Sequence, residues 1–530
     1  MKKFVFIAFA GICLFGCNAK DLDFDNIKGP NLSGTFGFPL GEVKYTLREI
    51  VENVGGDDLG LVEDSATQVL TIFYGDTIEY SAPDDLVQID DITNQSTIPV
   101  PTLTGPTSPD VVIDESFSIA YDPQDGEELD SIYYNTGDLE ATVVSTFGGD
   151  LSYTLTFENT KDLGTGVSAA LSGNISDGGS DVQSQSLVNH VTRLTSTTSN
   201  EFTVNFRGTI SLDATQSTDG TEEIRIDFAY RNQTFSAIYG KLGRDTLAVG
   251  NQEIDLSFFS DIGNQGIVFG NPKMRFDIRN SFGVPLGMDL SGVLGDDGEG
   301  GTAVNLSGEV ISDPPKVDAA TQLGAAVQSV FEINRENSNL DDLLANSPTR
   351  LLFNVSGITN PDDADLTQSN FLEPNSSITA YIEMEIPMDI KLEGLEQTDT
   401  ISLGSGLNIN DIDSAFLRVN TLNEFPFQAQ LSMEIQDSTN ATLYTIPQKL
   451  VLKAPFINVN GFVTDPSGAT VDIPFSEEGI EAIGTGSHIV MTVALSTPES
   501  VTSRDLFVKL LGDYSLEIRV GIAGRLNVDL

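Results

Sequence analysis

The feature that most constrains the fold is a β-hairpin pattern that occurs three times. Each copy has alternating apolar residues, a turn, and alternation again, which is typical of two antiparallel strands. The copies span residues 139–157, 274–290 and 416–435. Their turns share the form Ser/Asn-x-Phe-Gly/Pro, starting at Ser145, Asn280 and Asn423, so that successive turns are 135 and 143 residues apart. The repetition predicts three similar units along the chain.

Weaker signals flank each hairpin in the same order. Upstream stands a strand-like Asp-Thr-Ile/Leu, at residues 76–78, 245–247 and 399–401. Downstream comes a short helical pattern, at residues 187–194, 340–344 and 479–483. A strand pattern follows each of these, at residues 202–206, 351–355 and 489–493. Asn339 and Ser476 are expected to be N-caps of the last two helices, since their side chains can accept the free amides of a first turn.

The fold expected is mainly β: three tandem β-sandwich-like modules, each with a short helix. The segments that lack apolar periodicity, 195–200 and 346–348, serve as boundaries. They predict modules at residues 30–198, 199–348 and 349–530. A further helix over 45–53 is expected to pack on the first sheet.

The run Asn280-Ser-Phe-Gly-Val-Pro-Leu286, which follows the strand of the second hairpin, resembles the late-embryogenesis-type β-sandwich. In that family Asn and Pro residues interrupt the strand pattern of the first hairpin. The resemblance implies a fold and no functional site.

The N-terminus has the features of a cleaved secretory signal. Lys2 and Lys3 precede an apolar run over residues 4–15, which is too short to span a bilayer, and a small residue precedes Cys17. The tetrapeptide Leu14-Phe15-Gly16-Cys17 resembles the lipobox of bacterial lipoproteins. This resemblance implies that residues 1–16 are removed as a signal peptide, that Cys17 is lipidated, and that residues 17–29 form the linker to the anchor.

Residues next to Cys17 bear on where such a lipoprotein goes. The residue after Cys17 is Asn18. An aspartate at this position would resemble an inner-membrane retention signal, so with Asn18 the outer membrane is expected. The segment 20–25, Lys-Asp-Leu-Asp-Phe-Asp, resembles the export tag of surface lipoproteins in the Bacteroidota, although it also reads as a solvated acidic linker. The cell surface is therefore favoured slightly over the periplasmic face.

Charge and cysteine content exclude several classes of protein. The chain has 27 basic and 78 acidic residues, a formal net charge of −51. Nucleic acid is excluded as a partner, because its binding depends on clustered Lys and Arg. Cys13 and Cys17 are the two cysteines, so the mature chain has no internal disulfide and depends on buried apolar area for stability.

The sequence offers little for catalysis. His190 and His488 are the two histidines, no Gly-x-Ser-x-Gly elbow accompanies them, and both are expected to be structural. Zinc cannot be held by two separated histidines without a free thiol. We therefore predict no enzyme and no obligatory cofactor.

Calcium is the one ion that the sequence suggests, because oxygen ligands are abundant in acidic segments. The predicted site consists of Asp122, Asp125, Glu127 and Asp130. Two other segments, 362–365 and 408–413, are also acidic. None has the spacing of an EF-hand, and a solvated loop is the alternative for all three.

The leading functional prediction is a lipid-anchored, non-enzymatic binding or scaffold protein of the outer membrane, with a protein partner in the cell envelope such as an outer-membrane β-barrel. One alternative resembles the glycan-binding lipoproteins of polysaccharide-utilisation systems, in which case tyrosines near Tyr133 and Tyr134 would line a cleft. Absence of Trp, the best platform for a sugar ring, counts against it. A second alternative is a carboxylate-based hydrolase, which needs two acids across a deep groove.

Overall fold

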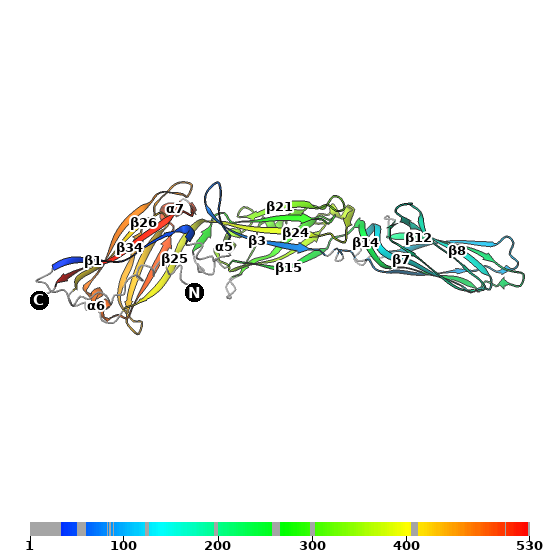
Figure 1. Cartoon of the computed structure of the whole chain (residues 1–530), viewed down its shortest axis with the longest axis horizontal. Coiled ribbons are helices and arrows are strands. Elements are labelled where there is room, and N and C mark those ends of the chain that lie inside the picture. The colour runs from blue at the N-terminus through cyan, green and yellow to red at the C-terminus, as the bar shows by residue number, and fades with distance from the viewer. Residues whose placement is uncertain are drawn as a thin grey trace.

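In the computed structural model, three β-sandwich modules lie in a row and form an elongated molecule (Figure 1). Nearly all regular structure is strand, which confirms the expected mainly-β class. The structure describes residues 33–49, 60–81, 83, 86–87, 89–121, 127–194, 200–256, 266–296, 303–403, 412–503 and 505–527. None of the helices within these ranges is long and apolar enough to cross a membrane.

The proximal module holds both the first and the last described strands. Its first layer is β1 (Ser33–Thr46), β34 (Ser515–Asn527), β26 (Ile412–Asn423) and β31 (Ser467–Phe475). Its second layer is β25 (Asp389–Ser402), β32 (His488–Ser496), β27 (Gln428–Gln436) and β28 (Thr442–Leu452), with β16 (Ile267–Phe269) and β33 (Val508–Lys509) on β25. Also here are β29 (Phe456–Ile457), β30 (Val463–Asp465), α6 (Glu477–Thr485) and α7 (Glu499–Thr502).

The middle module has the same two layers. The first is β2 (Gly60–Glu63), β3 (Leu70–Tyr80), β24 (Ile378–Pro387), β17 (Lys273–Asn280) and β21 (Val327–Asn334). The second is β15 (Thr246–Asp255), β22 (Arg350–Thr359) and β18 (Leu286–Asp296), with β19 (Val304–Asn305) and β20 (Lys316–Val317) on β18. Its helices are α4 (Glu309–Ser312), α5 (Leu340–Ala345) and the 3-10 turn η4 (Asp365–Thr367).

The distal module lies at the other end of the row. One layer is β4 (Ile92–Pro99), β14 (Glu223–Lys241), β7 (Glu128–Ser145) and β10 (Gly179–Ser186). The other is β9 (Ser168–Ile175), β8 (Asp150–Asp162), β12 (Glu201–Ser211) and β6 (Val111–Ala120). β11 (His190–Arg193) joins β7 to β8, β5 (Leu103–Thr104) pairs with β13 (Ser217–Thr218), and β23 (Asn370–Leu372) pairs with the end of β14.

The three modules share one strand order, which confirms the repeat. In each, the first strand of the predicted hairpin pairs with the last strand of the module, as β7 does with β14, β17 with β24 and β26 with β34. The second hairpin strand pairs with the strand that was predicted downstream, as β8 does with β12, β18 with β22 and β27 with β32. All three predicted hairpins are therefore present at equivalent places.

The modules are nested rather than consecutive. β1, β3 and β4 follow one another in sequence, yet each closes a different module by pairing with that module's last strand: β1 with β34, β3 with β24, and β4 with β14. The chain thus runs outward along the row, builds the distal module, and returns to complete the middle and then the proximal one (Figure 1).

This pairing crosses both expected module boundaries. β12, which begins just after residue 198, pairs with β6 and β8 on the other side of that boundary. β15 pairs with β22 across residue 348. Apolar periodicity marks strands but does not say which strands pair, so the expected first module, 30–198, contains strands that belong to three different modules. The strand at residues 76–78 correspondingly lies in the middle module, not the distal one.

The helix predictions had mixed outcomes. Helices α5 and α6 form where expected, and the Ser476 hydroxyl accepts the Gly479 amide as an N-cap. Asn339 does not cap α5, because its side chain bonds Ser307 and Asn305 instead. No helix forms over residues 187–194, where β11 stands. At 45–53 only residues 47–49 are helical among those described, since β1 extends to Thr46.

A fully buried asparagine fixes the hairpin turn in two of the modules. Asn280 donates to the carbonyls of Val284 (2.9 Å) and Asp318 (3.0 Å), and its oxygen accepts the Phe282 amide (2.9 Å). Asn423 makes the same three bonds, to the carbonyls of Phe427 and Lys453 and from the amide of Phe425. Buried main-chain groups need such partners, which explains why Asn recurs at the turn.

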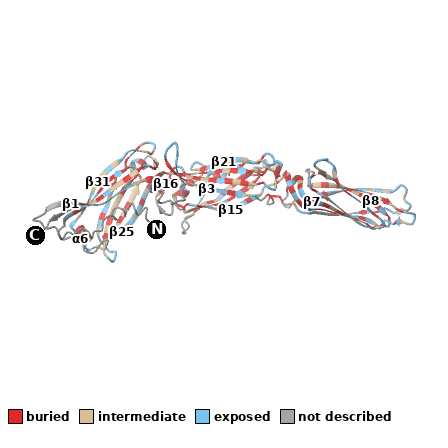
Figure 2. Ribbon diagram, in the orientation of Figure 1, coloured by how far each residue is buried: buried red, intermediate tan, exposed pale blue. Residues whose placement is uncertain are grey.

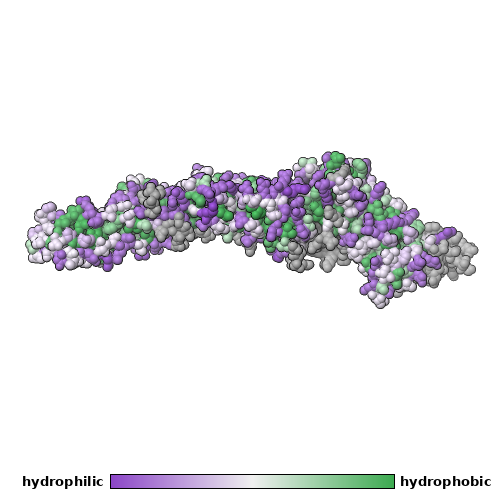
Figure 3. All heavy atoms as spheres, turned by 180° about the vertical axis from the view of Figure 1, so that it is seen from behind, coloured by the Kyte–Doolittle hydropathy of each residue, from purple (hydrophilic) through white to green (hydrophobic). Residues whose placement is uncertain are grey.

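Each module has its own apolar interior between its two layers (Figure 2). In the distal module, Tyr230 is fully buried and packs edge-on against Phe157 and Phe202, with ring centroids 5.9 and 5.4 Å apart. Its hydroxyl bonds that of Thr160 at 2.8 Å, so the polar end of the ring is satisfied. The described surface seen from behind is largely hydrophilic, with hydrophobic residues in separate patches (Figure 3).

Candidate functional site

The described part of the chain begins at one end of the row, in the proximal module. Cys17 lies outside the described residues, as does the linker from 17 to 29. Ser33, the first described residue, pairs with Asn527 at the outer end of this module, as Figure 1 shows for the start of β1. The distal module is therefore the part of the chain farthest from Ser33.

The predicted calcium ligands are only partly visible. Asp122 and Asp125 lie outside the described residues. Glu127 is buried, and its carbonyl accepts the Asn200 side chain at 2.8 Å. Asp130 accepts a hydrogen bond of 2.7 Å from Ser369 of the middle module. Within the described ranges no three His, Cys, Asp or Glu side chains are grouped as metal ligands, so calcium at this site stays a prediction.

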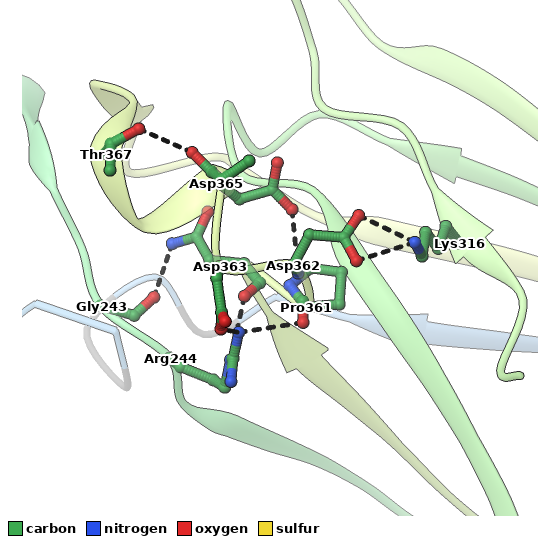
Figure 4. Close-up of polar contacts among 10 residues, drawn as sticks. Gly243, Arg244, Lys316, Pro361, Asp362, Asp363, Asp365 and Thr367 are labelled. Carbon is green, nitrogen blue, oxygen red and sulfur yellow. Dashed lines mark hydrogen bonds and ion pairs between the residues drawn. The ribbon is translucent and has the colours of Figure 1, made fainter. Parts of the chain in front are cut away.

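The acidic segment at 362–365 is held by basic residues. Both carboxylate oxygens of Asp362 lie 2.8 Å from Nζ of Lys316, and Asp363 pairs with Arg244 at 3.2 Å (Figure 4). Arg244 also donates to the carbonyl of Pro361 at 2.9 Å. These contacts fasten the loop after β22 to β20 and to the segment between β14 and β15. The segment 408–413 lies largely outside the described residues.

Both histidines bond to neighbouring groups. A ring nitrogen of buried His190 lies 3.0 Å from the Val188 carbonyl, and one of His488 lies 3.1 Å from Oε1 of Gln436. These contacts fit the structural role expected for them.

The two tyrosines proposed to line a cleft point in different directions. Tyr134 is buried and donates to Thr192 at 2.8 Å, and burial raises its pKa far above the usual value. Tyr133 packs edge-on against Tyr239 (5.7 Å), which in turn lies 5.9 Å from Phe371. These three rings sit where the distal and middle modules meet, so they bridge the two modules.

A groove on the outer face of the distal module is the best candidate for a binding site. We call it the distal groove. It has a volume of about 260 Å³ and crosses β4, β14, β7 and β10. It is lined by Thr93, Asn94, Gln95, Glu140, Ala141, Thr142, Val182, Asp227, Phe228, Ala229 and Arg231.

Strand alternation decides which side chains face the distal groove. On β14, Ile226, Phe228 and Tyr230 are buried in the core, so Asp227, Ala229 and Arg231 point outward. Ala229 forms the floor, because it stands between Thr93 on β4 and Glu140 on β7 and has no side chain beyond Cβ. Val182, two-thirds exposed, adds a second apolar surface.

The polar side chains that form the walls of the distal groove are held by hydrogen bonds and ion pairs with neighbouring side chains. Gln95 donates to Asp227 at 2.6 Å, and Arg225 holds the other oxygen of that carboxylate at 3.1 Å. Arg231 pairs with Glu140 at 3.2 Å and lies 3.8 Å from Asp91. Every charged side chain that lines the groove therefore has an opposite charge beside it, and the walls offer both donors and acceptors.

The equivalent position in the middle module carries a longer side chain. At the hairpin turns, Ser145 pairs with Ile224 of β14, and Asn280 pairs with Ile378 of β24. Ala229 and Glu383 follow these partners at the same distance along their strands, so they occupy equivalent positions. Arg275 stands opposite Glu383, as Glu140 stands opposite Ala229. A long side chain thus occupies the position that is the floor of the groove in the distal module.

Sequence reasoning missed the distal groove. Its walls come from residues 93–95, 140–142, 182 and 227–231, which meet only through strand pairing. The repeat itself offers a partial signal, since alignment of the last strands sets Ala229 against Glu383 of the middle module and Gly521 of the proximal module.

Comparisons with known proteins add no functional argument. No family model matches the chain, and no curated protein matches it. Among solved structures, a Parabacteroides distasonis protein described as a "putative secreted protein" is similar at 11% identity, over 53% of this chain and 82% of its own, with a TM-score of 0.34. A protein of infectious bursal disease virus is similar at 9% identity, over 89% of this chain and 82% of its own, with a TM-score of 0.15. Such scores are too low to transfer a role.

Proposed function

We propose that this chain is a lipid-anchored, non-enzymatic binding protein of the outer membrane that holds its distal module away from the membrane. The observation that carries the proposal is the direction of the row. The first described residue stands at the outer end of the proximal module, 16 positions after Cys17, and the distal groove lies on the opposite module. Acyl chains on Cys17 would supply the anchor.

A rigid row of modules suits this role better than modules joined by flexible linkers. At the distal junction, β23 of the middle segment adds to β14, and Asn360 donates to the Gly243 carbonyl at 2.5 Å. At the proximal junction, β16 pairs with β25. The main-chain amide of Leu70 donates to the carbonyl of Leu510, that of Leu510 to Met388, and that of Met388 to Leu70. Main-chain bonds between modules restrict bending and keep the distal end extended.

The binding role is favoured over hydrolysis by the setting of the acids. Glu140 and Asp227 are the two carboxylates that line the distal groove, and each is paired with an arginine. A glycosidase needs one carboxylic acid held neutral as a proton donor, usually by an apolar setting. The open, ion-paired walls of this groove do not provide that setting.

Protease shaving of intact cells tests the proposal. Full-length protein and a Cys17→Ser variant would be expressed in the native host, exposed to an external protease, and detected with antibodies against the distal and proximal modules. We expect wild-type protein in the outer-membrane fraction, labelled by a palmitate analogue and cleaved from outside. The variant should carry no label and leave the membrane fraction. Wild-type protein that is unlabelled and released without detergent would contradict the proposal.

A further inference from the structure

We propose that the distal groove binds a neutral, hydroxyl-rich ligand, namely one sugar residue of an uncharged polysaccharide. This inference rests on the proposed binding function and adds the ligand class and the site. It is argued from the composition of the groove, the charge of the chain, and the small residue at the floor, Ala229, where the middle module has Glu383.

The walls have the groups that a sugar ring needs. Hydroxyls act as both donors and acceptors, and the groove offers amide, carboxylate, hydroxyl and guanidinium groups from Gln95, Asp227, Thr142 and Arg231. The hydrogen bond between Gln95 and Asp227 and the ion pair of Arg231 with Glu140 hold these side chains in place before a ligand arrives. Preorganised polar groups lower the entropic cost of binding.

The floor suits the less polar face of such a ring. Ala229 and Val182 present only methyl groups, and the volume of about 260 Å³ is slightly below the roughly 300–1,000 Å³ of pockets that enclose drug-sized ligands. That space fits one ring unit with its neighbours in the polymer running along the open groove. No aromatic ring stacks on the floor, since Phe228 is buried in the core, so we expect weak binding.

Charge selects against anionic polymers. The chain has a formal net charge of −51, and the arginines at the groove are already paired with Glu140, Asp91 and Asp227. An anionic sugar would have to displace one of these carboxylates while approaching a strongly negative surface. A neutral sugar needs no such exchange.

Affinity electrophoresis tests the inference, because it detects weak binding to polymers. Native gels would contain starch, xylan, laminarin or mannan, with alginate and polygalacturonate as the anionic arms. We expect at least one neutral polysaccharide to retard the wild-type protein and neither anionic polymer to do so. Retardation by none of the neutral polymers, or by an anionic one alone, would overturn the inference.

Two variants locate the binding. Ala229→Glu installs the residue of the middle module on the floor and should abolish retardation, while Val167→Glu adds the same charge in the exposed β8–β9 turn and should not. Should Ala229→Glu fail to fold, Thr93→Ala with Gln95→Ala removes wall contacts without filling the floor and should weaken retardation at least tenfold. Retardation that persists in the folded variants would overturn the site. The shaving experiment reports anchoring independently, so a failed sugar test leaves the proposed function standing.

Discussion

The distal and middle modules have one strand order but differ at two matched positions. At the hairpin turn the middle module has Asn280, with three hydrogen bonds, and the distal module has Ser145, whose buried hydroxyl has no partner among the described residues. On the outer face the middle module has Glu383 where the distal module has Ala229. The distal copy therefore lacks the buried contact of the middle copy at the turn and carries a much smaller side chain on its outer face.

The largest effect is expected from deletion of β1, residues 33–46. Because β1 pairs along its length with β34, its loss turns the last strand of the proximal module into an exposed edge. We expect the proximal module to become sensitive to protease while the distal module stays resistant, as followed by limited proteolysis and mass spectrometry. Equal sensitivity of all three modules would show that they do not fold as separate units.

Asn280→Ala should come next. The substitution leaves one amide and two carbonyls unpaired inside the middle module, and each buried unsatisfied group costs about 1–3 kcal/mol. We expect the unfolding transition of the middle module to lose about 3 kcal/mol or more in urea. Asn423→Ala should do the same in the proximal module. A loss of less than about 1 kcal/mol in both would contradict the role given to the buried asparagine.

Ser145→Ala is the matched change in the distal module and should have a much smaller effect. The hydroxyl is buried without a partner, so its removal takes away a desolvated polar group. We expect the free energy of unfolding to stay unchanged or to rise by up to about 1 kcal/mol. A clear loss of stability would show that the serine makes a contact equivalent to that of the asparagines.

The smallest effect concerns pH at a turn that the distal and proximal modules share. The amide and hydroxyl of Thr165 bond Asp162 and lower the pKa of its carboxyl below the usual 3.8, and Thr439 does the same for Asp437. Because the pKa is lower in the folded state, the stabilisation by these hydrogen bonds is complete above the unfolded-state pKa of 3.8. It is lost as the pH falls through the folded-state pKa. The acidic titration of the Thr165 and Thr439 amide shifts in NMR should have its midpoint below pH 3.8. A midpoint at or above that pH would contradict the assignment.

The sequence predicted local structure well and connectivity poorly. The three hairpins, two of the helices and the Ser476 cap follow from periodicity and side-chain chemistry within a few residues. The pairing of β3 with β24 joins residues about three hundred positions apart, and no local pattern encodes it. The distal groove could not be predicted for the same reason, because its walls meet only when β4, β14, β7 and β10 align.

The nested order is the central claim, since it sets Ser33, the first described residue, and the distal groove at opposite ends of the row. Thr77 and Tyr381 are exposed partners on β3 and β24, and the sequence has no cysteine after Cys17. Paired substitutions Thr77→Cys and Tyr381→Cys should therefore form a disulfide in the exported protein, detected as a linked peptide by mass spectrometry. The pair Thr77→Cys and Arg207→Cys should not. A disulfide from residue 77 to 207, or none to 381, would contradict the account.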